Sequence, residues 1–503
     1  MSVALLCALV LAQTEANRDD AIFGGPEAAI TAPEPAAVDV SDAATEQRDA
    51  GFFDREGAQD TGMLLKQRTD DSDNKLVLGG KLYLRTEYNA YRDGVASEFP
   101  WQSPSYLDFY GDARPSERVR AYTSARLRYD FSVTEGALDT NGQVRRKQQI
   151  ALNELWLKFD LERVVFVTAG RQVVRWGAGR FWNPTDFLNS QYKDPLAVFD
   201  ERLGLALVKA HLPIESLGWN FYAVANLEDA ARPDEVGGAL RAEMVLGLAE
   251  LSLTAAKRKG TPAQYGVDLS AGLGPIDLKG EVALQRGLSA PFYQGPFNLT
   301  GLSPPYDVTD LAEPTPSLRA DSWFPRAVLG FEWGLKYSDD DALYVGGEYF
   351  YNSMGYRNVD KYAYLFMRGA YVPLYTGVHY AGAYVYLPAP GPFNNTTLLA
   401  SALANLSDRS FLARFDYRVR ILTYVDLLTH VAWHGGANGE LHYGTDVPAP
   451  ARALARYGQT CAEGASLMGD TGMSPEATQT FCQNGWHVTQ PFVDVGVGLS
   501  LAF

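Results

Sequence analysis

Apolar residues alternate with small or polar residues along the last eleven positions of the chain, 493–503. The apolar positions are Val493, Val495, Val497, Leu499, Leu501 and Phe503, and between them stand Asp494, Gly496, Gly498, Ser500 and Ala502. Successive side chains of a strand point to opposite faces, so this pattern predicts a strand with one apolar face. The strand ends at an aromatic carboxy-terminal residue.

The same alternation recurs along the chain and is clearest in residues 118–131. One face carries Arg118, Arg120, Tyr122, Ser124, Arg126, Arg128 and Asp130, and the other carries Val119, Ala121, Thr123, Ala125, Leu127, Tyr129 and Phe131. A soluble sheet of this kind needs a second apolar layer to cover it, whereas a membrane barrel is covered by lipid. We therefore expect an all-β protein, a transmembrane antiparallel up-and-down β-barrel.

Eighteen segments fit this pattern, with 16 strands as the fallback number. They are 81–90, 105–111, 118–131, 148–160, 163–173, 201–213, 217–229, 238–247, 249–258, 264–273, 276–287, 325–338, 341–354, 362–372, 374–388, 409–419, 421–434 and 490–503. Tight turns are expected at 161–162, 213–218, 274–275, 339–341 and 372–373, and long connections at 174–200, 288–324, 389–408 and 435–489. With the carboxy-terminus placed in the periplasm, all of these turns lie on the periplasmic side of the membrane and all of these long connections lie on its outer side.

The amino-terminal part of the chain has a different character. Residues 3–12 form an apolar run with no Lys or Arg before it. Ten helical residues reach about 15 Å, half of a bilayer's hydrocarbon core, so residues 1–16 are interpreted as a signal peptide. Residues 17–74 are rich in Ala, Pro, Asp and Glu and predict a flexible acidic periplasmic segment. The barrel is expected to occupy residues 75–503.

Composition and charge narrow the possible partners. The chain has 503 residues, a formal net charge of −16, 28 Tyr and 24 Phe but only 3 Cys. Nucleic acid is excluded as a partner because a phosphate binder needs a basic surface. Cys461 and Cys482 fall in the same long connection of an exported chain, which predicts a disulfide that pins this loop.

Catalytic and cofactor chemistry are not indicated. His430 and His434 are four apart, and on a strand this spacing places them about 13 Å apart on one face, too far to share a metal. No Ser-His-Asp order or nucleophile elbow stands out, and Gly177 and Gly179 precede no predicted helix, so they form no dinucleotide loop. We expect no enzyme, no metal and no cofactor.

Basic residues recur on the polar faces of the predicted strands. They are Arg85, Arg118, Arg120, Arg126, Arg128, Arg171, Arg414, Arg418 and Arg420. Arg on the lipid face costs roughly 2–4 kcal/mol at mid-bilayer, so these side chains are expected to face the lumen. Two interpretations stay open. The arginines either pair with lumen acids such as Glu87, Asp130, Glu154, Glu281, Glu332, Glu348 and Asp416, or form ladders that select anions.

The most distinctive local motif lies in residues 170–188. A strand with Gly170-Arg171-Gln172 leads into Trp176-Gly177 and then Asn183-Pro184-Thr185-Asp186. This run resembles the alginate-export-like outer-membrane β-barrel porins and a related group of uncharacterised outer-membrane barrel proteins. The last strand with its terminal Phe503 resembles the insertion signal of bacterial outer-membrane barrels.

The resemblance implies a lumen in which basic residues conduct a polyuronate. Arg171, Arg175 and Arg180 match these residues by motif or character. The neighbouring residues Phe181, Trp182, Asn183 and Asp186 either fold inward as a constriction or form a rigid external loop.

The expected protein is therefore a monomeric channel of the bacterial outer membrane that passes a solute passively, with an anionic sugar or polysaccharide as the candidate solute. Its partners would be outer-membrane lipid, the barrel-insertion machinery, and a small or polymeric solute. One alternative is a plugged barrel for hydrophobic or aromatic compounds, whose arginines would be fully paired. Another is a structural or adhesive barrel that acts through its extracellular loops.

Overall fold

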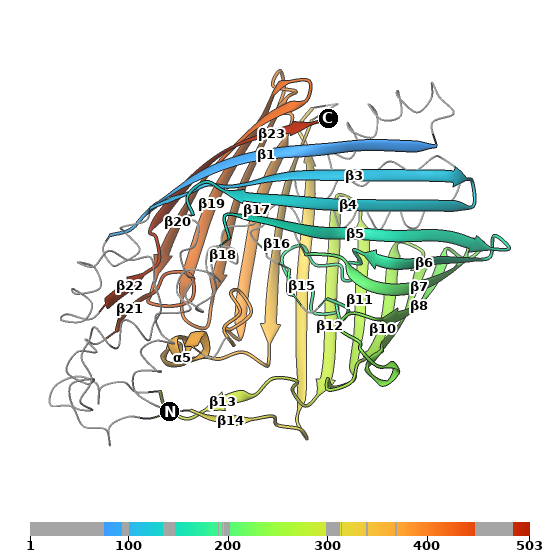
Figure 1. The fold of residues 1–503 in the computed structure, drawn as a ribbon. Coiled ribbons are helices and arrows are strands. Elements are labelled where there is room, and N and C mark those ends of the chain that lie inside the picture. The colour runs from blue at the N-terminus through green and yellow to red at the C-terminus, as the bar shows by residue number, and fades with distance from the viewer. Residues whose placement is uncertain are drawn as a thin grey trace.

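A computed structural model gives the fold (Figure 1). It describes residues 75–92, 100–133, 146–189, 191–193, 195, 202–297, 312, 314–338, 341–367, 370–447 and 486–503. The expected signal peptide 1–16, the expected acidic segment 17–74, and both Cys461 and Cys482 lie outside the described residues.

Eighteen strands form the wall of one closed antiparallel barrel. The main sheet has 19 strands, and the nineteenth is β2 (Trp101–Gln102), two residues that only extend the pairing of β1. The wall strands are β1 (Leu76–Ala90), β3 (Pro104–Ser116), β4 (Val119–Asp130), β5 (Gln148–Leu161), β6 (Val165–Gln172), β7 (Leu205–Ile214), β8 (Trp219–Asn226), β9 (Gly237–Leu246), β10 (Ala249–Lys257), β11 (Gln264–Leu273), β12 (Ile276–Arg286), β15 (Trp323–Lys336), β16 (Ala342–Asn352), β17 (His379–Pro388), β18 (Thr396–Asn405), β19 (Ser410–Leu422), β20 (Val425–Gly436) and β23 (Val493–Ala502). The predicted barrel of 18 strands is confirmed.

The first and last wall strands close the ring. β1 pairs with β23 in an unbroken antiparallel register from Lys81↔Ala502 to Ala90↔Val493. The terminal residue continues this pairing, because the amide of Phe503 donates to Gly80 O at 3.0 Å and its carbonyl accepts from Gly80 N at 2.8 Å. The Phe503 ring lies 6.3 Å from the ring of Phe109 in an edge contact. Closure leaves the sheet without a free edge.

Side chains alternate between an apolar outward face and a polar or packed inward face. On β23, Val495, Val497 and Leu499 point outward and are exposed, while Asp494, Gly496 and Ser500 are buried inside. β15 repeats this with Leu329, Phe331 and Trp333 outside. A closed barrel with an apolar exterior satisfies its backbone hydrogen bonds internally and suits a bilayer.

The two ends of the barrel differ. At the turn end, which carries Phe503, short connections join β5 to β6, β7 to β8, β9 to β10 and β11 to β12. The predicted turns 161–162, 213–218 and 274–275 fall here, and 339–341 falls within the connection from β15 to β16. At the loop end lie the long connections β6–β7, β12–β15 and β20–β23, which contain the predicted range 174–200, most of 288–324 and most of 435–489.

Two predictions about strands were wrong. One added a strand and the other omitted one, so the predicted number of strands is unchanged. Residues 362–372, predicted as a strand that a turn at 372–373 follows, begin instead with the helix α5 (Tyr362–Met367) after the 3-10 helix η5 (Val359–Lys361). Residues 389–408, predicted as a long connection, contain the wall strand β18. The lumen face of β18 carries Leu399 and Leu403, which pack inside the barrel, between the polar residues Thr397, Ser401 and Asn405, so polar alternation is weak along this strand.

Smaller elements belong to the loop end. They are η2 (Pro233–Glu235), the hairpin β13 (Phe292–Gln294) with β14 (Thr315–Ser317), and the pair β21 (Gly444–Val447) with β22 (Trp486–Thr489). In Figure 1 the hairpin and α5 lie far from the labelled carboxy-terminus. Among the described residues, no helix is long and apolar enough to cross a membrane.

Candidate functional site

The lumen holds most of the predicted basic residues, and they form ion pairs there. The guanidinium of Arg126 lies 2.6 Å from Asp108, that of Arg120 lies 2.9 Å from Asp112, and Arg85 contacts Glu87. On β19, the guanidinium of Arg414 lies 2.7 Å from Asp416, and those of Arg418 and Arg420 lie 2.7 and 3.4 Å from Asp426. Arg128 lies with its guanidinium 5.8 Å from the centre of the Tyr106 ring. The lumen wall is thus charged with both signs.

Arg171 departs from the expected orientation. Its register partners are Leu155 and Ala206, and Leu155 is on the outward face with 54% of its surface exposed. Arg171 therefore belongs to the outward row, near the end of β6, where its guanidinium lies 3.1 Å from Glu228. The end of a strand allows this charge, since the loop carboxylate lies beside it. Arg118 lies in the turn after β3, half exposed, 2.8 Å from Asp160.

The connection after β6 folds into the barrel instead of outward. Two carboxylates on distant wall strands hold it by its backbone amides. Glu281 on β12 accepts from the amides of Ala178 and Gly179, both at 2.6 Å, and from the hydroxyl of Thr185 at 2.8 Å. Residues 174–189 are called the inward segment below. Phe181, Trp182, Asn183 and Asp186 all lie on this segment, and their role as a constriction stays a prediction.

Glu348 on β16 is the second carboxylate. It accepts from the amides of Arg180 and Phe181, the latter at 2.7 Å, and from Trp182 N at 3.4 Å. In ring order β6 and β16 are separated by β7–β12 and β15, so the inward segment reaches across the lumen to a distant part of the wall. Charge-assisted bonds from several amides to one carboxylate fix its backbone.

The local sequence of the inward segment explains its tight path. Gly177 has a φ of +110°, which an L side chain rarely adopts, and a Cβ there would meet Asn183 at 2.6 Å. The side-chain amide of Asn183 donates to Gly179 O at 3.0 Å and closes the bend. Asp186 accepts from Asn189 at 2.9 Å and from Arg202 at 2.6 Å. The Trp-Gly and Asn-Pro-Thr-Asp motifs thus build the turn that carries Phe181 and Trp182.

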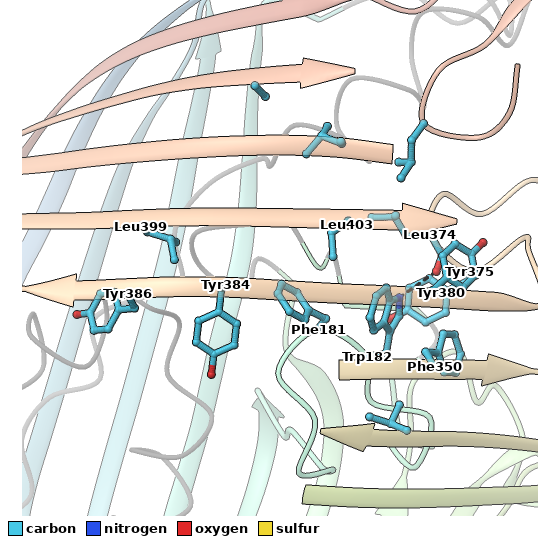
Figure 2. Packing of buried hydrophobic residues seen from close by; sticks show 14 residues of the cluster. Phe181, Trp182, Phe350, Leu374, Tyr375, Tyr380, Tyr384, Tyr386, Leu399 and Leu403 are labelled. Atoms are coloured by element: carbon cyan, nitrogen blue, oxygen red, sulfur yellow. Dashed lines mark hydrogen bonds between the residues drawn. The ribbon is translucent and has the colours of Figure 1, made fainter. Parts of the chain in front are cut away.

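Phe181 and Trp182 pack in an aromatic cluster against β15–β20. This cluster is called the lumen plug. Its buried members are Phe181, Trp182, Val328, Phe350, Leu374, Tyr375, Tyr380, Tyr384, Tyr386, Leu399, Leu403, Leu412, Ala432 and Leu441. Figure 2 shows the two rings of the inward segment beside Tyr380 and Tyr384 of β17. Trp182 is fully buried and stacks on Phe350 at 5.6 Å. Gly382 makes room, since a Cβ there would meet the Phe181 ring at 2.6 Å.

Two further segments join the plug from the loop end. The carbonyl of Leu374, between α5 and β17, accepts from the Trp182 indole at 3.0 Å. The amide of Leu374 donates to Glu440 at 2.6 Å, and Glu440 also accepts from Tyr380 at 2.6 Å and Asn405 at 2.7 Å. Burial, with the negative charge of Asp408, raises the pKa of Glu440 to about 8. Glu440 therefore ties two loop segments to the wall.

A second apolar group, the loop cap, lies at the loop end. Tyr293, Tyr362, Tyr364 and Leu365 are buried together there. The hairpin residue Phe292 stacks on Tyr356 at 4.5 Å, and the Tyr293 amide donates to the Tyr356 hydroxyl at 2.8 Å. Thus the connections β12–β15 and β16–β17 pack on each other.

Arg175 and Arg180 lie on the inward segment itself. Arg180 is half-buried, with its guanidinium 5.6 Å from the centre of the Tyr384 ring, and its carbonyl accepts from Lys193 Nζ at 2.7 Å. Arg175 is half-buried as well. Arg180 therefore lies against the lumen plug, and the conduction role that the resemblance implies for both arginines stays a prediction.

Sequence reasoning missed the roles of Glu281, Glu348 and Glu440. One of the two open interpretations paired the first two with lumen arginines, but the structure places backbone amides on them. Their position on a polar strand face gave no signal of this, because the amides come from a connection with no repeating pattern. Among the described residues, no group of three or more His, Cys, Asp or Glu is placed to hold a metal ion.

No known family model and no curated protein matches the chain. Solved structures with a similar fold include two mutant porins of Rhodopseudomonas blastica. A triple mutant is 11% identical, with 85% of this chain and 100% of that chain covered and a TM-score of 0.38, and a second mutant gives 11%, the same coverage and 0.39. Pseudomonas aeruginosa OpdK, solved with vanillate, is 9% identical, with 85% and 98% covered and a TM-score of 0.43. The fold is assigned from the chain's own strand pairing.

Proposed function

We propose that the protein is a channel of a bacterial outer membrane that passes an anionic solute, such as an acidic sugar or polysaccharide, past the inward segment. The apolar exterior of the closed barrel supports the membrane location. The resemblance of the motif in residues 170–188 to alginate-export-like barrels supports the class of solute, and no family model tests it. No catalytic step is part of the proposal.

The observation that carries the proposal is the division of the lumen into two kinds of wall. The lumen plug rests on β15–β20, whereas β4 and β5 present Arg120, Arg126, Arg128 and Lys158 inward, and β3 beside them presents Asp108 and Asp112. β5 and β16 are nine strands apart in either direction around the ring of 18, so these walls face each other in the ring order. A passage between them would have arginines with their carboxylate partners on one side and rings on the other, and the guanidinium and ammonium groups of the first side would attract an anionic sugar.

A second candidate function is favoured by a separate observation. Eight of the predicted arginines have a carboxylate within 4 Å: Arg85, Arg118, Arg120, Arg126, Arg171, Arg414, Arg418 and Arg420. This pairing, together with the aromatic lumen plug, favours a plugged barrel for hydrophobic or aromatic compounds. The adhesive alternative depends on the connection 435–489, most of which lies outside the described residues.

Conductance separates the two functions. The refolded protein is placed in a planar bilayer under a salt gradient, and single-channel conductance and reversal potential are measured. The proposed channel gives an anion-selective conductance that polyuronates block, and Arg126→Ser with Arg128→Ser shifts the reversal potential toward cation preference. A silent barrel would reject the proposal in favour of the plugged transporter.

A further inference from the structure

The outward rows of the barrel wall carry few charges, and these charges are all positive. In the wall strands that the structure describes, the Asp, Glu, Lys and Arg residues that point outward are Arg171, Lys257 and Arg286. Each is the last or second-last residue of its strand, and in each case that strand ends at the loop end. The chain has 60 acidic and 44 basic residues, so composition alone would favour acids at these positions. The outward surface at the loop end is therefore suited to contact with negative charge.

Lys257 and Arg286 lie in one row of the sheet, two strands apart. Ala256 on β10 pairs with Gln264 on β11, and Gln264 pairs with Gln285 on β12. The next residues toward the loop end, Lys257 and Arg286, are therefore level with each other. With strands about 4.8 Å apart, their Cα atoms are about 10 Å apart.

The present contacts of these two cations leave them able to bind another anion. The ammonium of Lys257 donates to the carbonyl of Thr261 at 2.6 Å, which is a neutral partner. The guanidinium of Arg286 lies 3.1 Å from Asp321, whose side chain is 94% exposed. An exposed ion pair of this kind contributes little to stability, so its exchange for another anion costs little.

An apolar groove lies in the outward face of β7–β10, beside Lys257. Its volume is about 600 Å³, within the range of about 300–1,000 Å³ that is usual for ligand sites. Alanines line its low positions and larger apolar side chains such as Phe221 and Leu240 stand between them. The alanines are Ala210, Ala223, Ala242 and Ala255. Ala255 is two residues from Lys257 along β10, a distance of about 7 Å.

The groove and the two cations together fit an anionic lipid. A groove on the outward face of a membrane barrel is filled by hydrocarbon, and cations at the edge of the apolar band attract lipid headgroups. Two cations about 10 Å apart match two separate anionic groups better than a single one. Lipid A, the glycolipid of the outer leaflet of bacterial outer membranes, carries two phosphates on a disaccharide above several acyl chains.

We propose that this face of the barrel binds one diphosphorylated glycolipid of the lipid A type. Lys257 and Arg286 each contact one phosphate, and an acyl chain of the same molecule occupies the groove. The site rests on the membrane location in the proposed function, with the loop end outside, and it does not depend on the solute. It assigns a ligand to outward charges that take no part in the lumen.

Native mass spectrometry of the purified full-length barrel, released from detergent micelles that contain lipid A, measures the affinity. Lys257→Gln with Arg286→Gln should bind lipid A about tenfold more weakly, because two charge-assisted contacts are lost. Lys257→Arg with Arg286→Lys keeps both charges and should retain most of the affinity. Arg232→Gln with Lys259→Gln is the charge-matched control. Both of its residues lie in loops of the same end and pair there with acids, so this variant should bind as the unaltered protein.

The groove is tested separately from the charges. Ala223→Leu with Ala242→Leu fills it and should weaken the binding of lipid A severalfold although both cations remain. Ala383→Leu with Ala402→Leu is the matched control, because these exposed alanines lie on the outward faces of β17 and β18. An equal loss of affinity in the two variants would show that the groove is not part of the site.

Two further lipids define the headgroup. Lipid A without its phosphates should bind weakly and equally to the unaltered protein and to the variant with both Gln substitutions at Lys257 and Arg286. Phosphatidylglycerol has one phosphate and two acyl chains. If it binds as tightly as lipid A and depends equally on Lys257 and Arg286, the assignment to lipid A is overturned. Heat-modified mobility verifies that each variant is folded.

The outcomes separate this site from the proposed function. If the unaltered protein is anion-selective in the bilayer but binds lipid A as tightly without the two cations, the lipid site is overturned and the channel stands. If the unaltered protein is silent in the bilayer but loses lipid A when Lys257 and Arg286 are replaced by Gln, the channel is overturned and the lipid site stands. A tenfold loss that the charge-keeping variant avoids supports the site.

Discussion

Glu281 and Glu348 fix the path of the inward segment by accepting hydrogen bonds from its amides. A buried amide without a partner is costly, so a connection that leaves the wall needs acceptors wherever it lies inside the barrel. Each carboxylate has two oxygens with several acceptor sites, and one residue can therefore satisfy two or three successive amides. This replaces the pairing that a strand would provide.

Replacing Glu348 by Ala should release part of the inward segment. The amides of Arg180 and Phe181 lose their acceptor, and a buried unsatisfied donor costs roughly 1–3 kcal/mol. We expect a lower free energy of unfolding and a larger, noisier single-channel conductance. Glu243→Ala is the control, because Glu243 is a lumen carboxylate that accepts from Arg241 at 2.7 Å. An equal rise in conductance for both variants would contradict the role of Glu348.

Glu440 should make the loop end sensitive to pH. A solvated Glu has a pKa near 4.3, whereas burial raises the pKa of Glu440 to about 8. Between these two pKa values, Glu440 holds a proton when the loop segments are packed and releases it when they open. The free energy that favours the packed state is therefore fully present below the solvated pKa and falls as the pH rises toward the raised pKa of the packed state.

Conductance recorded from about pH 5 to about pH 9 measures this effect, because opening of the loop segments becomes more frequent across the window. Glu440→Gln should flatten the profile, since the amide does not titrate. Tyr362, Tyr371, Tyr380 and Asp408 surround the carboxyl group and are kept unchanged. A profile of unaltered steepness in the Gln variant would assign the pH dependence to another group.

Individual strands show where alternation of apolar and polar residues predicts the structure and where it does not. β23 and β4 were predicted well because lipid on one side and charges on the other impose a period of two. β18 carries Leu399 and Leu403 among the polar residues of its lumen face, so its sequence shows no clear alternation and was predicted as a connection. Residues 362–372 are rich in aromatic residues for a different reason, since Tyr362, Tyr364 and Leu365 pack in the loop cap.

The lumen plug should depend on the inward face of β18 more than on its outward face. Leu403 is buried in the plug, and its replacement by Ala should lower the free energy of unfolding by about 2–5 kcal/mol through loss of contacts and a cavity. Leu398→Ala, on the outward face of the same strand, removes the same atoms and should cost less. Urea unfolding of the refolded protein in lipid vesicles compares the two. Equal losses would show that Leu403 is not a core position of the plug.

The closed barrel explains which parts of the site could be located from the sequence alone. The barrel architecture and the lumen orientation follow from the local alternation that most wall strands carry, and Arg120, Arg126 and Arg414 could be placed from it, whereas β18 could not. Arg171 could not, because the end of a strand tolerates an outward charge beside a loop carboxylate. The bonds of Glu281 and Glu348 join residues about 100 and 170 positions apart, and only the closed ring brings them together.

The wall of the barrel closes without the inward segment, so the barrel should tolerate replacement of that segment. Residues 176–186 pair with no strand of the wall, so exchanging them for a Gly-Ser linker should leave the 18 strands intact. Conductance should rise severalfold, and Phe350, Tyr380 and Tyr384 should become accessible because Phe181 and Trp182 no longer cover them. The same exchange at 229–235, in a loop-end connection, should leave conductance unchanged. A barrel that conducts no better after loss of 176–186 would mean that the narrowest part of the lumen lies elsewhere, with the segments that Glu440 holds as the next to be removed.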